Sequence, residues 1–222
     1  MQYLNCSQLR VLIIVLNSST IIRHARHMRE TGLAAVGYFY IDFRDPAKQD
    51  PRGLLSSLLA QLCTQSNAFF DILSELYAKH NQGGEIPNEL ALEKCLRKML
   101  ECPEQAPVFI VVDALDECPA SRSPGSPPGS SPPRQSVLRI LKKLTKLENL
   151  HLCLTSRYEF DIQDALDPLK PVGVSLHNQK GQLADIAQYV ESFVVSDTIM
   201  KRWPKKTQKL VIDTLAEKSR GM

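Results

Sequence analysis

One buried-strand pattern constrains the fold of this 222-residue chain more than any other feature. Residues Val108 to Val112 form an unbroken apolar run, mostly β-branched, that directly follows Pro107. A run without polar alternation is typical of a strand that is covered on both faces, as in parallel α/β sheets. The sequence therefore predicts a core strand at 108–112, in a sheet whose two faces are both packed.

Three carboxylates follow this strand within five positions: Asp113, Asp116 and Glu117. In open parallel sheets, ligands bind just beyond the carboxyl ends of the strands. Mg²⁺ prefers one or two carboxylates together with water and phosphate oxygens. We therefore predict a magnesium site here, with Asp113 as the metal ligand. The alternative is that Asp113 only caps the next segment, as many strand-ending aspartates do.

Strand and helix patterns alternate along the chain. Strands are predicted at 11–16, 35–42, 108–112, 150–154 and 172–176, and helices lie between them. This alternation predicts an α/β fold, a P-loop NTPase-like parallel sheet with helices on both faces. The helix after residue 66 carries a stripe that we interpret as core, formed by Phe69, Phe70, Leu73, Leu76 and Tyr77.

Composition divides the chain into segments. Residues 1–178 are predicted to form the α/β core. Within it, 13 of the 16 residues of 119–134 are Pro, Ser or Gly, so we predict a disordered surface insertion there. Residues 179–222 are predicted to begin a helical subdomain. The final Arg220-Gly221-Met222 follows a helix closely, which suggests a cut rather than a natural domain end.

Cysteine usage and charge limit the classes of partner. The six cysteines contain no C-x-x-C pair, which argues against a zinc site or a disulfide framework and fits a reducing, cytoplasmic setting. The net charge of +3 does not imply an acidic partner. Basic residues around Trp203 could contact nucleic acid, but we favour a solvated connector. No apolar run approaches the ~20 residues that span a bilayer. We expect neither nucleic acid nor membrane as a partner.

Four segments together resemble one known family. Val111 to Cys118, with the sequence VVDALDEC, closely resembles the Walker B segment of NACHT NTPases, especially the fungal, nephrocystin-3-like members of this STAND class. Residues 37–43, 154–157 and 218–222 agree with the same family. The resemblance covers about residues 15–222. It implies a nucleotide-dependent oligomerisation switch in signalling.

The resemblance also implies roles for individual residues. Asp113 would hold Mg²⁺ through water, and Asp116 and Glu117, as the catalytic pair, would orient or deprotonate the attacking water. Arg157 would bind the nucleotide by sensing its γ-phosphate. The implied cofactors are therefore Mg²⁺ and either ATP or GTP.

The phosphate-binding motif of that family is missing from this sequence. The family needs G-x-x-x-x-G-K-[ST], whose backbone N–H groups and lysine hold the phosphates, yet none of the ten glycines here precedes a lysine. Losing three charge-assisted hydrogen bonds, at ~1.5–3 kcal/mol each, costs about 4.5 kcal/mol or more, on the order of a thousandfold in affinity. We therefore predict a truncated switch module that is defective in ATP or GTP binding and hydrolysis.

Three functions remain open at this point. The first is the nucleotide-switch module with weak or lost nucleotide binding, whose protein partners come through self-association or flanking domains. The second is a scaffold fragment that binds no nucleotide and keeps its sheet only for packing. The third is an active Mg²⁺-dependent NTPase whose phosphate site is completed by another chain.

Overall fold

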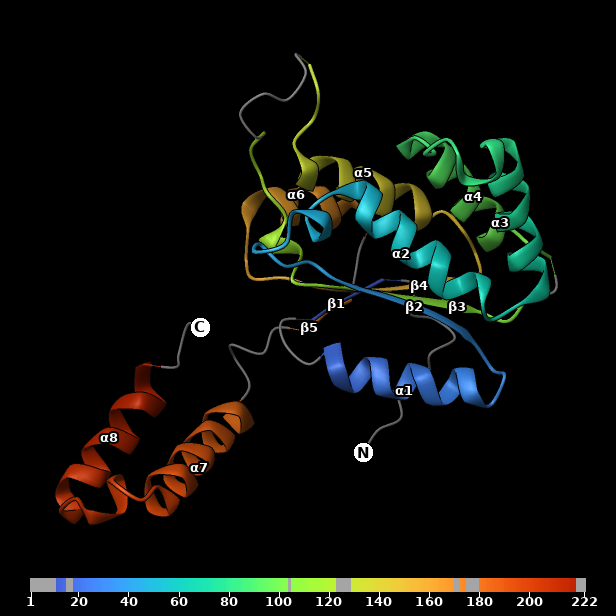
Figure 1. The fold of residues 1–222 in the computed structure, drawn as a ribbon. Coiled ribbons are helices and arrows are strands. Elements are labelled where there is room, and N and C mark those ends of the chain that lie inside the picture. Colours follow the sequence, from blue (N-terminus) through green and yellow to red (C-terminus); the bar gives the residue numbers. More distant parts are fainter. Residues whose placement is uncertain are drawn as a thin grey trace. The chain divides into compact units, whose positions relative to one another are not determined.

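A parallel sheet of five strands organises residues 1–174 (Figure 1), and its strand order is β2-β3-β4-β1-β5. The strands are β1 Val11–Ile14, β2 Ala35–Tyr40, β3 Val108–Asp113, β4 Leu150–Thr155 and β5 Val172–Val174. Because β3 pairs in parallel with both β2 and β4, the strand predicted from the apolar run is an interior strand. The carboxyl ends of all five strands therefore lie along one edge of the sheet.

The computed structural model describes residues 11–14, 18–103, 105–122, 129–169, 172–174 and 180–218. The predicted strands agree with the observed ones except at their ends. β2 ends at Tyr40, two residues before the predicted end, and Asp42, which pairs with Arg44, belongs to the loop that follows. Residues 15–16 and 175–176, also predicted as strand, lie outside the described residues.

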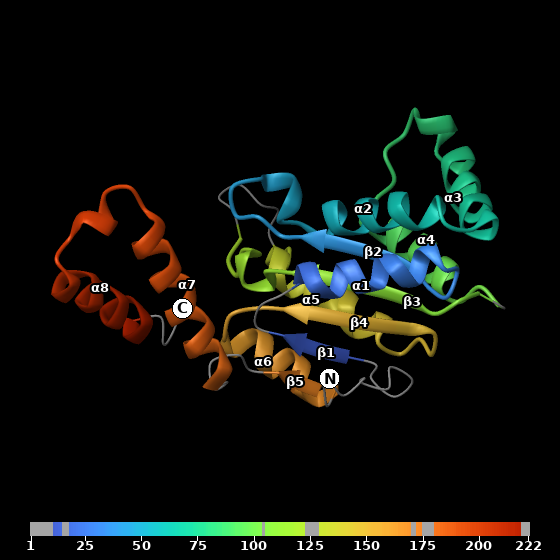
Figure 2. The same ribbon diagram turned by 90° about the horizontal axis from the view of Figure 1, so that it is seen from below.

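Helices cover both faces of the sheet, as predicted for a P-loop-like α/β fold. One face is covered by α1 Ser18–Glu30 (Figures 1 and 2). On the opposite side lie α2 Pro51–Cys63, α3 Asn67–Lys79, α4 Glu89–Leu100, α5 Pro133–Leu144 and α6 Phe160–Leu166. Residues 1–174 therefore form an α/β domain with a P-loop-like fold.

The main core lies between the sheet and α2. This helix begins where the sequence predicts, because the Asp50 carboxylate accepts the Gly53 N–H at 2.6 Å and Pro51 occupies the first turn. Its inner face is a continuous row of buried leucines, namely Leu54, Leu55, Leu58, Leu59 and Leu62. They pack in one cluster with strand residues such as Ile110 and Leu152. Each such side chain contributes roughly 1.5–3 kcal/mol through burial.

The apolar stripe of α3 is only partly core. Phe69 is completely buried, but Phe70 and Tyr77 are 58% and 57% exposed, so the prediction that the whole stripe packs inward was wrong. The reason is that α3 packs on α2 and α4 rather than on the sheet. The side of α3 that carries Phe70 and Tyr77 is therefore left largely uncovered.

The predicted disordered insertion at 119–134 was wrong at its C-terminal end. Helix α5 begins at Pro133, and the next residue, Arg134, is only 7% exposed. Residues 123–128 of the insertion lie outside the described residues. The sequence also gave no signal for α6, a short helix whose Ile162 and Leu166 are fully buried.

The second unit, residues 175–222, is helical. Its helices α7 Lys180–Ser196 and α8 Lys205–Lys218 pack against one another, and the basic segment around Trp203 connects them. The buried Gln208 side chain donates to the carbonyl oxygens of Met200, Lys201 and Trp203, which fixes the connector. In the described part of both units, no helix has the length and apolar character needed to span a membrane.

Buried thiols give a direct test of this core. None of the five described cysteines is in a disulfide, and burial raises the pKa of both Cys118 and Cys153 to about 12. At pH 8 only about one in ten thousand of these thiols is then ionised, and the thiolate is the reactive form. We expect iodoacetamide to label the partly exposed Cys63 and Cys102 in the native chain.

Labelling of Cys118 and Cys153 should require guanidinium, which mass spectrometry of the peptides would show. If native Cys118 reacts as fast as Cys63, the packing described here around the loop after β3 is incorrect.

Candidate functional site

The predicted metal ligand lies at the carboxyl edge of the sheet. Asp113 is the last residue of β3, and its carboxylate accepts a hydrogen bond from the hydroxyl of Thr155, the last residue of β4. The same Thr155 oxygen accepts the Ala114 N–H at 2.9 Å, and this side chain is almost completely buried. Thr155 therefore fixes the end of β3 to the end of the neighbouring strand.

A tight turn follows Asp113. Ala114 adopts a left-handed conformation, with φ +55°, which is uncommon for a residue other than glycine. Residues Leu115–Glu117 then form a 3₁₀ turn, closed by the Glu117 N–H donating to the Ala114 carbonyl at 2.9 Å. Leu115 is fully buried and anchors the turn. The turn directs Asp116 back toward the end of β4.

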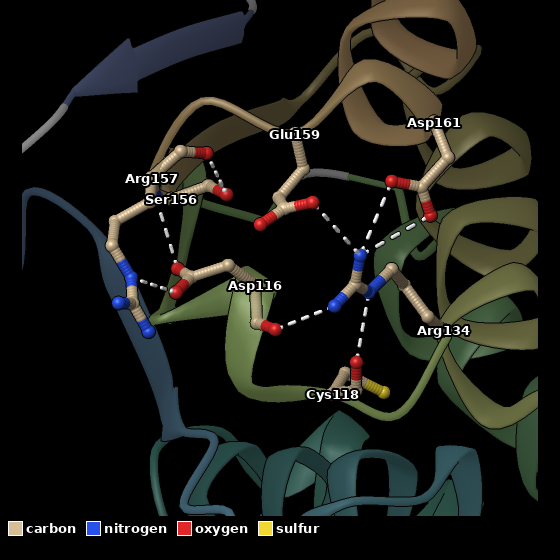
Figure 3. Close-up of polar contacts among 7 residues, drawn as sticks. All are labelled: Asp116, Cys118, Arg134, Ser156, Arg157, Glu159 and Asp161. Atoms are coloured by element: carbon tan, nitrogen blue, oxygen red, sulfur yellow. Dashed lines mark hydrogen bonds and ion pairs between the residues drawn. The ribbon is translucent and has the colours of Figure 1, made fainter. Parts of the chain in front are cut away.

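Asp116 and Arg157 form a two-point contact at this edge (Figure 3). The Asp116 carboxylate accepts the backbone N–H of Arg157 at 3.0 Å and its Nε at 2.7 Å. The aspartate side chain is 6% exposed and that of the arginine 73%. Burial raises the pKa of Asp116, but the hydrogen bonds from Arg157 outweigh it and lower the pKa below its usual value. Asp116 is therefore ionised at neutral pH.

The contact with Asp116 leaves the two Nη groups of Arg157 available to bind a ligand. Within the part of the chain that the structure describes, neither Nη group of Arg157 donates a hydrogen bond. The planar fork of a guanidinium matches phosphate oxygens, so two exposed Nη groups can bind an anion. Asp116, in contrast, uses both oxygens on Arg157, which favours a positioning role for it over proton abstraction.

Glu117 is directed elsewhere. Its Oε2 accepts the backbone N–H of Phe43 at 3.1 Å, so it ties the loop after β2 to the loop after β3. In that loop, a side-chain hydrogen bond from Arg44 lowers the pKa of Asp42 to about 2. The catalytic role that the resemblance implies for Glu117 stays a prediction.

The three carboxylates thus have three different partners and do not converge. Among the described residues, no group of three His, Cys, Asp or Glu side chains could hold a metal ion. A magnesium ion at this edge would depend on Asp113, supplemented by water and by phosphate oxygens of a nucleotide. This fits the chemistry of Mg²⁺, which keeps several waters and needs only one or two protein carboxylates.

Sequence reasoning missed Arg134, which holds the loop after β3 in place (Figure 3). Its Nη2 donates to the Asp116 carbonyl at 2.6 Å, and its Nε donates to the Cys118 carbonyl at 2.8 Å. Nη1 pairs with Asp161 of α6 at 3.1 Å and lies 3.8 Å from Glu159. The one available signal was Pro133 before an apolar helical pattern, since proline favours the first turn of a helix.

A large groove lies beside this site rather than at it. It encloses about 980 Å³ between α5 and α6, and Arg134, Lys142, Phe160 and Asp164 are among its lining residues. Asp113, Asp116 and Arg157 do not line it. The predicted nucleotide site at the carboxyl edge of the sheet is therefore not part of this groove.

Comparison with solved structures finds distant likenesses, among them three complexes of Drosophila ORC. Drosophila ORC bound to DNA is 14% identical over 75% of this chain and 78% of that one, with a TM-score of 0.35. Drosophila ORC bound to AT-rich DNA and Cdc6 is 13% identical over 96% and 73%, with a TM-score of 0.41. The complex with GC-rich DNA and Cdc6 is 12% identical over 96% and 74%, with a TM-score of 0.37. These likenesses assign no ligand to this chain. No curated protein matches it in sequence.

A family match is more informative. Residues 15–157, which are 143 of the 222 residues, match the family described as Nephrocystin 3, N-terminal. The matched segment contains β3, the turn after it and β4, and it ends at Arg157. It therefore includes all four residues discussed at the carboxyl edge, Asp113, Asp116, Glu117 and Arg157. The chain belongs to the Nephrocystin 3, N-terminal family.

Proposed function

We propose that this chain is a NACHT-type nucleotide-switch module of a signalling protein, with weak ATP or GTP binding and little or no hydrolysis. The observation that carries the proposal is the Asp116–Arg157 contact beside Asp113, at the tips of two adjacent parallel strands. It holds the exposed guanidinium of Arg157 at the edge where parallel sheets bind ligands, and neither Nη group of this side chain donates a hydrogen bond to any other described residue. The family match and the P-loop-like fold support the same function.

Each residue would contribute a different interaction with a nucleotide. Asp113 would hold Mg²⁺ through water, and Thr155 would keep its carboxylate in place. The exposed Nη groups of Arg157 would contact the terminal phosphate, while Asp116 fixes the direction of that side chain. Bound Mg²⁺ would neutralise the negative charge of the phosphates. A switch results if loss of the terminal phosphate removes the contact with Arg157.

Weak affinity follows from the missing lysine. Without a Gly-Lys-Ser/Thr segment, the phosphates lose the lysine and the glycine-rich cradle. The cost of about 4.5 kcal/mol changes a micromolar site into a millimolar one.

One observation favours the scaffold as a second candidate. All three carboxylates at the edge accept hydrogen bonds from the protein itself, from Thr155, Arg157 and the Phe43 N–H respectively. Side chains that serve only to connect the loops after β2, β3 and β4 would be arranged in the same way. In that function the edge is a structural junction and binds no nucleotide.

Titrating ATP with Mg²⁺ into the purified chain, and following its melting temperature, tests these functions. We expect a small rise in melting temperature at millimolar ATP, and the rise should be larger with Mg²⁺ than with EDTA. Asp113→Ala should abolish the Mg²⁺-dependent part of this rise in melting temperature, because it removes the predicted metal ligand. Asp164→Ala, at an exposed aspartate of α6, is the matched control and should respond like the unmodified chain.

Three other results would favour a different conclusion. An unchanged response in Asp113→Ala would remove that residue from the site. Failure of the unmodified chain to respond to ATP would favour the scaffold. Measurable turnover that is lost in Asp116→Ala would favour an NTPase completed by another chain.

A further inference from the structure

The free edge of β2 carries an unusual set of hydrogen bonds. β2 lies at the end of the sheet, and among the strands that the structure describes it pairs with β3 alone. In a parallel strand, the N–H and C=O of one residue point to one side, and those of the next residue point to the opposite side. Ala35 and Ile41 bond toward β3, since their N–H groups donate to Pro107 and Asp113. The peptide groups of Val36 and Tyr38 therefore face the open edge.

Two glutamine side chains occupy that edge. The Val36 N–H donates to Oε1 of Gln65 at 2.9 Å, and Nε2 of Gln65 donates back to the Val36 carbonyl at 2.7 Å. In the same way, the Tyr38 N–H donates to Oε1 of Gln61 at 3.0 Å, and Nε2 of Gln61 donates to the Tyr38 carbonyl at 2.7 Å. Each carboxamide thus reproduces the two hydrogen bonds that a neighbouring strand would make.

The spacing of the two glutamines matches the strand. Gln61 lies in the last turn of α2 and Gln65 just after the end of this helix at Cys63, and they reach Tyr38 and Val36, which are two positions apart on β2. Gln61 is further held by Ser57, whose hydroxyl accepts its Nε2 at 3.0 Å, and Gln65 donates to the Gln61 carbonyl at 2.8 Å. Each carboxamide is therefore also held by a group of α2, the Ser57 hydroxyl for Gln61 and the main-chain carbonyl of Gln61 for Gln65.

The sequence of β2 explains why the two glutamine side chains matter at this edge. Its six residues, AVGYFY, contain no charge and no proline, and valine and aromatic residues favour strands. Natural edge strands usually resist pairing with other chains through charges, proline or bulges. Uncharged six-residue segments of high strand propensity are the ones most prone to intermolecular pairing.

We propose that Gln61 and Gln65 close the edge of β2 against strand addition by a second copy of this chain. The occupant that they exclude is the β2 strand of that copy, which offers the same uncharged edge. The proposal does not depend on nucleotide binding, because none of these residues belongs to the carboxyl-edge site.

The test compares the full chain with its Gln61→Ala/Gln65→Ala variant by size-exclusion chromatography with light scattering. At low concentration we expect the variant to have the mass of one chain. As its concentration rises, the mass should increase toward that of two or more chains. Gln135→Ala/Gln163→Ala removes two glutamines of α5 and α6 and should behave like the unmodified chain. Hydrogen exchange should show loss of protection at Val36 and Tyr38 in the dilute variant and its return on association.

A third variant separates strand pairing from general destabilisation. Adding Tyr40→Lys to the double variant places a charge on the edge strand, at a side chain that is 41% exposed, and should restore the single-chain mass. The proposal is overturned if the double variant keeps the mass of one chain at its highest soluble concentration. Association that Tyr40→Lys does not relieve would overturn it as well.

Discussion

Arg134→Ala is expected to lower the free energy of unfolding by about 3–5 kcal/mol, because hydrogen bonds from a charged donor contribute roughly 1.5–3 kcal/mol each. The guanidinium supplies two such bonds to main-chain carbonyls, those of Asp116 and Cys118. Alanine would leave both carbonyls without this donor. The ion pair with Asp161 adds little, since that carboxylate is 49% exposed and screened by water.

Arg139→Ala on the same helix is the matched control. Arg139 pairs with Glu89 at 2.8 Å and Glu93 at 3.4 Å, but it is 47% exposed. Exposed pairs contribute only about 0–1 kcal/mol. Urea denaturation of both variants would give the two free energies. Equal losses would show that Arg134 does not stabilise the loop after β3 as described.

Loss of Arg134 should also affect the edge where Asp116 lies. Arg134 holds the Asp116 carbonyl, and the Asp116 carboxylate holds Arg157 (Figure 3). The side chain that would sense phosphate is therefore positioned through two successive contacts. A residue predicted to lie in a disordered loop proves to be part of the support of the candidate site.

Phe69→Ala is expected to cost about 3–5 kcal/mol of unfolding free energy, the range for removing a buried phenylalanine. Phe69 has no exposed surface and belongs to the main core cluster. Its removal leaves a cavity that the surrounding side chains cannot fill completely, so lost burial and lost contacts both contribute.

The neighbouring Phe70→Ala provides the control with identical chemistry. Phe70 is 58% exposed, and substitutions at such surface positions usually change stability by no more than about 0.5 kcal/mol. Chemical denaturation curves of the two variants should therefore differ strongly in midpoint. Similar midpoints would mean that α3 is rotated relative to the orientation described here.

Local signals were sufficient for most of the architecture. The apolar run at 108–112 predicted an interior parallel strand, and β3 is one, because loss of polar alternation reports burial on both faces. Asp50-Pro51 predicted the start of α2, because capping depends on residues that are close in sequence. The resemblance of VVDALDEC to NACHT NTPases led to the family that the match over 15–157 shows.

The arrangement of side chains required the tertiary structure. The sequence placed Asp116 after the third predicted strand and Arg157 after the fourth, but only the structure showed that these strands are neighbours and that Asp116 binds Arg157 across 41 positions of chain. Periodicity treated Phe69 and Phe70 alike, because it reports that a helix has an apolar side and not how wide a strip its neighbours cover.

Composition likewise assigned Arg134 to a disordered segment, because its burial depends on carbonyl groups brought to it by the turn after β3. The sequence by itself therefore determined the strands, most of the helices, the fold class and the family, which follow from local patterning. Only the folded chain decided which polar groups meet, as when Gln65 reaches Val36 across 29 positions. The physical reason is that such contacts depend on how whole elements pack, and no local pattern encodes them.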